Sequence, residues 1–110
     1  MTGSTNLEQE HFIIKSNKIL HKVAFDTIIY VEANGDYVKV YTTEGCIITN
    51  STFTNIISSL PEKQFVRTHK SFAINLSKLS SISGNTAIVL ERRVPIGQKY
   101  KSEFMARVIR

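Results

Sequence analysis

The 110-residue sequence has one cysteine, no tryptophan, two prolines and no apolar run of the roughly 18 residues that a transmembrane helix needs. Because Cys46 is alone, these residues form neither an internal disulfide nor a cysteine-based metal site. Cys46 stands beside Ile47 and Ile48, which predicts a buried free thiol rather than a nucleophile. No signal-peptide pattern is present, so we expect a cytoplasmic protein without a membrane partner.

Catalytic machinery is also scarce. His11, His21 and His69 are scattered, and none has the i, i+4 spacing of a zinc-protease helix. Four carboxylates stand near predicted turns or strand ends, where solvation is the default: Asp26, Glu32, Asp36 and Glu44. The sequence has no P-loop and no Gly-x-Gly-x-x-Gly fingerprint. We therefore expect no enzymatic activity, no metal site and no cofactor.

Negative charge is sparse in the second half of the chain. Residues 1–60 hold 4 Lys/Arg against 6 Asp/Glu, a net charge of −2, whereas residues 61–110 hold 10 against 3, a net charge of +7. This asymmetry favours a polyanionic partner at the C-terminal half, either nucleic acid or an anionic membrane surface.

Most of the chain consists of short β-rich runs separated by turn residues. Hydrophobic residues make up 42% and charged residues 21%, as in an ordinary single globular domain. The runs rich in β-branched and aromatic residues, or alternating in polarity, lie at 12–15, 18–23, 27–33, 37–42, 46–49, 65–66, 72–74, 79–83, 86–90 and 94–96. The polar residues 1–11 lack periodicity and predict a linker or a cloning-derived end, with the domain proper at 12–110.

Two segments have helical spacing instead. Phe53, Ile56, Ile57 and Leu60 share one helical face, which predicts a short helix capped by Asn50 or Ser51 and covering one end of a β core. Tyr100, Phe104 and Val108 predict a closing amphipathic helix, and Asn75 is placed to cap a helical turn through Lys78. The residues thus predict a predominantly all-β domain of eight to ten short strands with one or two short helices.

Three polar groups stand at predicted loops or strand ends. They are the hairpin 34–36 with Tyr37 and Lys39, the tripeptide 69–71, and the segment 97–101. Lys and Gln side chains address base edges, while Lys, Tyr and Ser equally bind phosphate. For the first group an alternative remains open, in which Tyr37 and Tyr41 pack in the core and Lys39 extends onto a solvated surface.

Three stretches in the same order and spacing resemble the signatures of LytTR (LytR/AlgR-type) DNA-binding domains: EANGDY at 32–37, FVRTHKSF at 65–72 with Asn75, and VPIG at 94–97 followed by Lys99 and Tyr100. The resemblance covers residues 12–108. It implies an elongated all-β fold of about ten short strands, whose loops enter successive major grooves. It also implies the output domain of a bacterial two-component response regulator, joined to a receiver domain that a sensor kinase controls.

The resemblance assigns roles to individual residues. It implies base contacts from Lys39, Lys70 and Lys99. Backbone or supporting contacts are implied for a second set: Tyr37, Arg67, His69, Ser71, Gln98, Tyr100 and Lys101. Arg67 and Asn75 fit an alternative role, in which they hold the fold by bonding loop carbonyls and capping the following turn. Lys70 and Lys99 stand where arginine is common in the family, and lysine offers a point charge in place of a planar fork.

The sequence therefore predicts sequence-specific binding of double-stranded DNA, with direct repeats as the target and a role in transcription regulation. The alternative is a β-rich interaction module that binds a protein partner or an anionic surface through the basic C-terminal half. Binding of single-stranded nucleic acid ranks lower, because it relies on exposed aromatic rings and the chain has no tryptophan.

Overall fold

The computed structural model describes residues 10–109, so the predicted linker 1–11 lies outside it except for its last two residues. His11 already begins the first strand, β1 (His11–Ser16), which pairs with β2 (Ile19–Ala24) in an antiparallel hairpin. Asn17 and Lys18 connect the two strands with φ of 52° and 66°. Positive φ at both central residues gives the two-residue turn whose twist matches that of paired strands.

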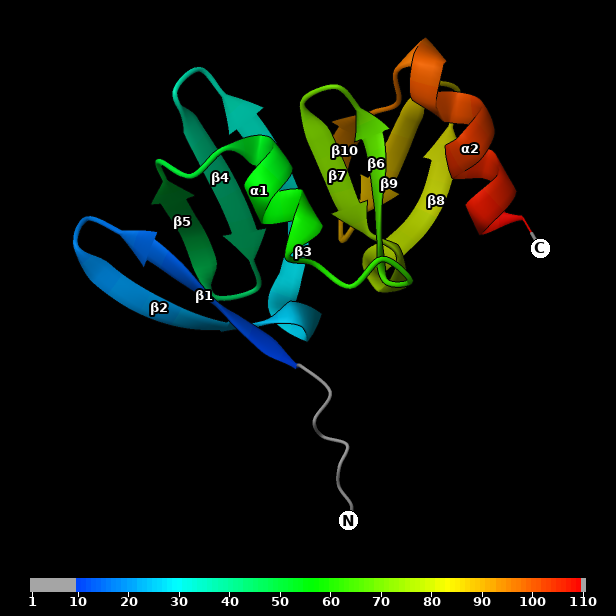
Figure 1. Cartoon of the computed structure of the whole chain (residues 1–110). Coiled ribbons are helices and arrows are strands. Elements are labelled where there is room, and N and C mark those ends of the chain that lie inside the picture. Colours follow the sequence, from blue (N-terminus) through cyan, green and yellow to red (C-terminus); the bar gives the residue numbers. More distant parts are fainter. Residues whose placement is uncertain (1–9, 110) are drawn as a thin grey trace.

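The remaining strands form two antiparallel sheets (Figure 1). The larger has the order β5-β4-β3-β7-β6 and contains β3 (Ile28–Asn34), β4 (Tyr37–Thr42), β5 (Gly45–Thr49), β6 (Phe65–His69) and β7 (Phe72–Asn75). The smaller has the order β10-β9-β8 and contains β8 (Leu79–Ser83), β9 (Thr86–Val89) and β10 (Arg92–Pro95). The ten strands confirm the predicted all-β fold class.

The structure of residues 10–109 also contains two helices and two single helical turns: α1 (Phe53–Ser58), α2 (Gln98–Val108) and the 3-10 turns η2 (Phe25–Thr27) and η3 (Leu76–Lys78). The predicted cap of α1 was wrong, because Thr52 Oγ1 and not Asn50 or Ser51 accepts the hydrogen bond from the Asn55 amide, at 3.0 Å. None of the helices within residues 10–109 is long and apolar enough to cross a membrane.

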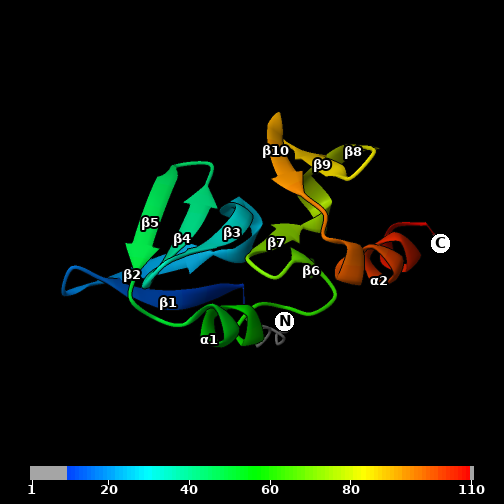
Figure 2. The same cartoon turned by 90° about the horizontal axis from the view of Figure 1, so that it is seen from above.

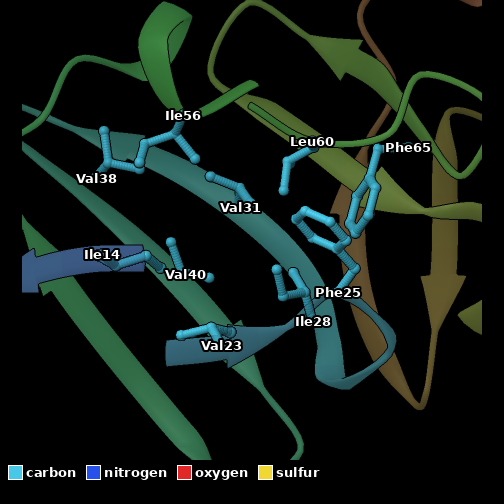
Figure 3. Close-up of a cluster of buried hydrophobic side chains, with 10 residues drawn as sticks. All are labelled: Ile14, Val23, Phe25, Ile28, Val31, Val38, Val40, Ile56, Leu60 and Phe65. Carbon is cyan, nitrogen blue, oxygen red and sulfur yellow. The ribbon is translucent and has the colours of Figure 1, made fainter. Parts of the chain in front are cut away.

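Two hydrophobic cores lie on different parts of the larger sheet. In the first, the β1–β2 hairpin and α1 cover one sheet face, and Ile56 of α1 joins a buried cluster that includes Val31 and Val38 of the sheet (Figures 2 and 3). This confirms that α1 closes a β core. The second core lies between β3, β6 and β7 of the larger sheet, the smaller sheet and α2. Phe104 of α2 is fully buried in it. The other buried members are Ile29, Val66, Ile74, Ala87, Val89, Val94 and Ile96.

Asn75 joins the two halves of the larger sheet at one end. Its side chain is fully buried; the amide donates to the Ile28 carbonyl at 2.8 Å, and Oδ1 accepts from the Ser77 amide at 3.0 Å. The predicted cap of the turn through Lys78 is thereby confirmed as η3.

We expect Asn75→Ala to lower the free energy of unfolding by about 1–3 kcal/mol, because it leaves the buried Ile28 carbonyl and the part-buried Ser77 amide without these partners. Urea denaturation followed by circular dichroism measures the change. Asn55→Ala, on the exposed face of α1, is the matched control and is expected to stay within about 0.5 kcal/mol of the parent. Equal midpoints for the two variants would contradict the role of Asn75.

Candidate nucleic-acid interface

The three predicted polar groups, apart from Lys39 of the first, lie along one edge of the molecule. The β3–β4 turn, the β6–β7 turn and the loop leading from β10 into α2 all reach the upper edge in Figure 1. Each group lies where paired strands end at a turn or, for residues 98–101, where α2 begins, so its side chains stand at the ends of regular elements. Residues 34–37, 69–71 and 97–101, which are far apart in sequence, thus form a single row.

Backbone hydrogen bonds join the three connections to one another. The Ala33 amide donates to the Ser71 carbonyl at 2.8 Å, and the Gly97 amide donates to the Thr68 carbonyl at 2.7 Å. The first bond extends the β3–β7 ladder to its very end, while the second fastens the start of α2 to β6. The relative positions of the three connections are therefore set by the main chain.

Arg67 supports the β6–β7 turn from below. Its Nε donates to the His69 carbonyl at 3.2 Å and its Nη2 to the Lys70 carbonyl at 2.5 Å. The guanidinium carbon also lies 5.0 Å from the ring centroid of Phe53 and 5.2 Å from that of Tyr100, within cation–π range. Arg67 thus bonds loop carbonyls, as its alternative role requires, and it bridges α1, the turn and α2.

His69 is oriented by its neighbours. Its Nδ1 accepts a hydrogen bond from the Ser71 amide at 3.1 Å, and its ring meets Phe72 edge-on at 5.6 Å. A Cβ placed on Gly97 would lie 3.3 Å from His69 Cδ2, which is a tight contact, so the absence of a side chain at 97 eases the close approach of the two connections. Because its Nδ1 accepts this hydrogen bond, the His69 side chain stabilises the conformation of the β6–β7 turn.

The lysines of the row have different environments. Lys70 and Lys99 are exposed beside half-buried Ser71 and exposed Gln98, which leaves both ammonium groups facing solvent. Lys101 is half-buried, and its Nζ donates to Asn85 Oδ1 at 2.8 Å, which ties α2 to the β8–β9 turn.

Lys39 lies within β4 and outside the row, on the face of the larger sheet that points away from the first core. It is half-buried, directly opposite Glu32 on β3 and Ile48 on β5. The carboxylate of Glu32 also accepts from the Tyr41 hydroxyl at 3.3 Å. The structure therefore places Lys39 beside an acidic side chain, whereas Lys70 stands in the β6–β7 turn and Lys99 in the first turn of α2.

The tyrosines of β4 are not core residues. Tyr37 is 52% exposed at the β3–β4 turn, so the alternative that buries it was wrong. Tyr41 stacks on Tyr30 with ring centroids 4.4 Å apart, on the sheet face away from the first core, and Arg92 of β10 lies 5.6 Å above its ring. Burial in this stack, assisted by the neighbouring Tyr30 and Glu32, raises the pKa of Tyr41 to about 12.

The prediction that Cys46 is a buried thiol was wrong. It is exposed on β5 opposite Tyr41, because alternation along the strand turns Ile47 inward and Cys46 outward. Partial desolvation of the sulfur raises the pKa of the thiol, which leaves it a poor nucleophile. Within residues 10–109 no three His, Cys, Asp or Glu side chains gather to hold a metal ion.

We expect Arg67→Met to lower the free energy of unfolding by about 1–3 kcal/mol, because it removes two charge-assisted hydrogen bonds and two cation–π contacts but keeps the packing of the stem. Chemical denaturation provides the measurement. Arg93→Met, at an exposed position of β10, is the control and is expected to change little. An equal loss of unfolding free energy in both variants would contradict the role of Arg67 in stabilising the β6–β7 turn.

Comparison with known proteins agrees with this geometry. The family model of the LytTr DNA-binding domain matches residues 18–108. The chain is 34% identical over 74 residues to the transcriptional regulatory protein NatR of Bacillus subtilis, covering 67% of this chain and 32% of that protein. It is 30% identical over 99 residues to the transcriptional regulatory protein YpdB of Escherichia coli K12, covering 84% and 40%.

A solved structure has the same fold. A LytTr DNA-binding domain from Bacillus cereus superposes with a TM-score of 0.79 at 23% identity, covering 93% of this chain and 99% of that one. The chain spans only about a third to two fifths of the length of the curated relatives, at 32% and 40%. With the family model matching most of its length, the chain belongs to the LytTR DNA-binding domain family.

Proposed function

We propose that this chain binds double-stranded DNA in a sequence-specific manner, as the DNA-binding output domain of a bacterial transcription regulator. The observation that carries the proposal is the row of three connections along one edge, held together by the Ala33–Ser71 and Gly97–Thr68 hydrogen bonds. Family membership and relatives named transcriptional regulatory proteins support it. The +7 charge of residues 61–110, which supply two of the three connections, suits a polyanion.

The dimensions of the domain suit a duplex. Its longest axis is 38 Å, comparable with the roughly 34–36 Å that one turn of B-DNA occupies. Lys70 and Lys99 are the leading candidates for base contacts, since a lysine donates well to the O6 and N7 acceptors of guanine. Lys39 follows them, because Glu32 stands opposite and competes for its charge.

The other residues of the row position the readers. Tyr37, Ser71, Gln98 and Tyr100 are suited to phosphate or to framing the bases, and Lys101 divides its donors between DNA and Asn85. Arg67 and His69 act through the turn that carries Lys70. None of these roles requires a chemical step, so the domain acts as a binding module and not as an enzyme.

In the whole regulator we propose that this domain is linked to a receiver domain under the control of a sensor kinase, with direct repeats in the DNA as its target. Relatives more than twice as long as the chain leave room for such a domain. The family of response regulators implied by the sequence motifs supports the same arrangement.

We expect Lys70→Ala and Lys99→Ala each to weaken binding to a duplex obtained by in vitro selection by about 5- to 150-fold, as loss of a base contact costs about 1–3 kcal/mol. Both side chains are exposed, so the free energy of unfolding is expected to stay within about 0.5 kcal/mol of the parent. Gel-shift titration measures affinity. Lys63→Ala, which precedes β6 and so lies at the end of that strand opposite Lys70, is the control. Unchanged affinity in both variants would remove these lysines from the interface.

The salt dependence of binding tests the class of ligand. With about six phosphates neutralised, log affinity is expected to fall with log salt at a slope near −5. Fluorescence anisotropy of a labelled duplex between low and physiological salt measures it. A flat response, or a domain that prefers anionic vesicles to the duplex in direct competition, would overturn the proposal in favour of the interaction-module alternative.

A further inference from the structure

A groove adjoins the candidate interface on the side of the β3–β4 turn. It has a volume of about 960 Å³ and lies between the turn of the β1–β2 hairpin and the segment that leaves β5. Lys15, Asn17 and Lys18 line one side, and Asn50 and Ser51 line the other. Tyr37, the exposed tyrosine of the β3–β4 turn, also lines it, so the groove continues the row of connections.

The hairpin that carries these lysines is held in place. Ile14 is 2% exposed and packs in the first hydrophobic core, which anchors β1 beneath the sheet. The Ser16 hydroxyl donates to the Ile48 carbonyl of β5, on the edge of the sheet. Positive φ at Asn17 and Lys18 then fixes the direction of the turn. Lys15 and Lys18 therefore project from a defined backbone.

The charge of the groove is opposite to that of the half of the chain that forms it. Residues 1–60 carry a net charge of −2, yet three of their four basic residues lie on this hairpin: Lys15, Lys18 and Lys22. Among the described residues that line the groove, two are lysines and none is an aspartate or glutamate. A local concentration of positive charge beside the exposed amide side chains of Asn17 and Asn50 is complementary to phosphate.

The floor of the groove is compatible with nucleic acid. Ile13 is 57% exposed and Ile48 45% exposed. Deoxyribose carbons and thymine methyl groups offer apolar surface that packs against such side chains. A duplex lying along the row of connections would bring its sugar-phosphate backbone over this floor, next to both lysines.

We infer that the groove is a fourth DNA contact, in which Lys15 and Lys18 bind backbone phosphates that flank the segment read by the three connections. The inference rests on the proposed function and extends it, because the footprint then reaches past Tyr37 to the N-terminal hairpin. The contact is to phosphates and so adds affinity without adding base preference.

The test is the double variant Lys15→Ala/Lys18→Ala of the full chain, titrated on a selected duplex over a range of salt. We expect affinity to fall about 5- to 50-fold at low salt and the slope of log affinity against log salt to become shallower by about 2, because two phosphates are no longer neutralised by the protein. The control is Lys22→Ala/Lys63→Ala, which removes the same charge from exposed positions outside the groove. It is expected to keep more of the parental slope than the groove variant.

Shortening the duplex separates the groove from general charge. Removal of base pairs from the flank nearest the β3–β4 turn is expected to weaken the parent protein and to leave the double variant unaffected. Equal slopes for the groove variant and the control would overturn the inference while leaving the proposed function intact. Failure of the parent protein to bind any duplex would overturn both.

Discussion

Strand β3 contributes side chains to both hydrophobic cores, and the arrangement of the elements on either side of it depends on this. Ile28 and Val31 face the first core, whereas Ile29 belongs to the second. The pairing of β3 with β4 shifts register between Ile28 and Tyr30, which adjusts the strand where it passes from one core to the other. Because β3 also pairs with β7, both cores share one continuous sheet, and the β3–β4 and β6–β7 turns end at the same edge.

Along that edge, some basic residues are bonded within the protein, whereas others are exposed and available to a ligand. Arg67 directs its donors to carbonyls and its charge to aromatic rings, so it is occupied by the protein. Lys70, three residues later, is exposed and keeps its charge for a ligand. The same division recurs in α2, where Lys99 is exposed and Lys101 bonds Asn85. A basic cluster in the sequence thus contains both scaffold and contact residues, and only the structure distinguishes them.

Much of the fold follows from local sequence. Alternating β-branched residues predicted the strand at 37–42 with its observed bounds, and the spacing of Phe53, Ile56 and Leu60 located α1. Errors arose where neighbouring residues satisfy the same rule. Asn50, Ser51 and Thr52 are all good caps, and only backbone geometry selects Thr52. The run Cys46-Ile47-Ile48 resembled a buried strand, yet β5 is an edge strand with one face outward.

The residues of the candidate site could be predicted from the sequence, but their arrangement in space could not. The motifs located the three connections, but the Ala33–Ser71 and Gly97–Thr68 bonds involve main-chain atoms, which any residue supplies and no side-chain pattern announces. Nothing in the sequence marks the hairpin lysines either, because Lys15 and Lys18 fall in the runs 12–15 and 18–23, which predict only strands. Their proximity to Tyr37 is a product of tertiary packing.

The main-chain bonds between connections also bear on the DNA. The backbone positions of the three connections have a fixed spacing, so the connections cannot shift individually to follow a duplex of different pitch. In a complex of the proposed kind, a mismatch in spacing beyond the reach of the flexible lysine side chains has to be absorbed by twisting or bending the DNA. The energy of that deformation depends on the base steps between the contacts. A protein of this design would therefore discriminate among sequences at positions it never touches, through the stiffness of the double helix.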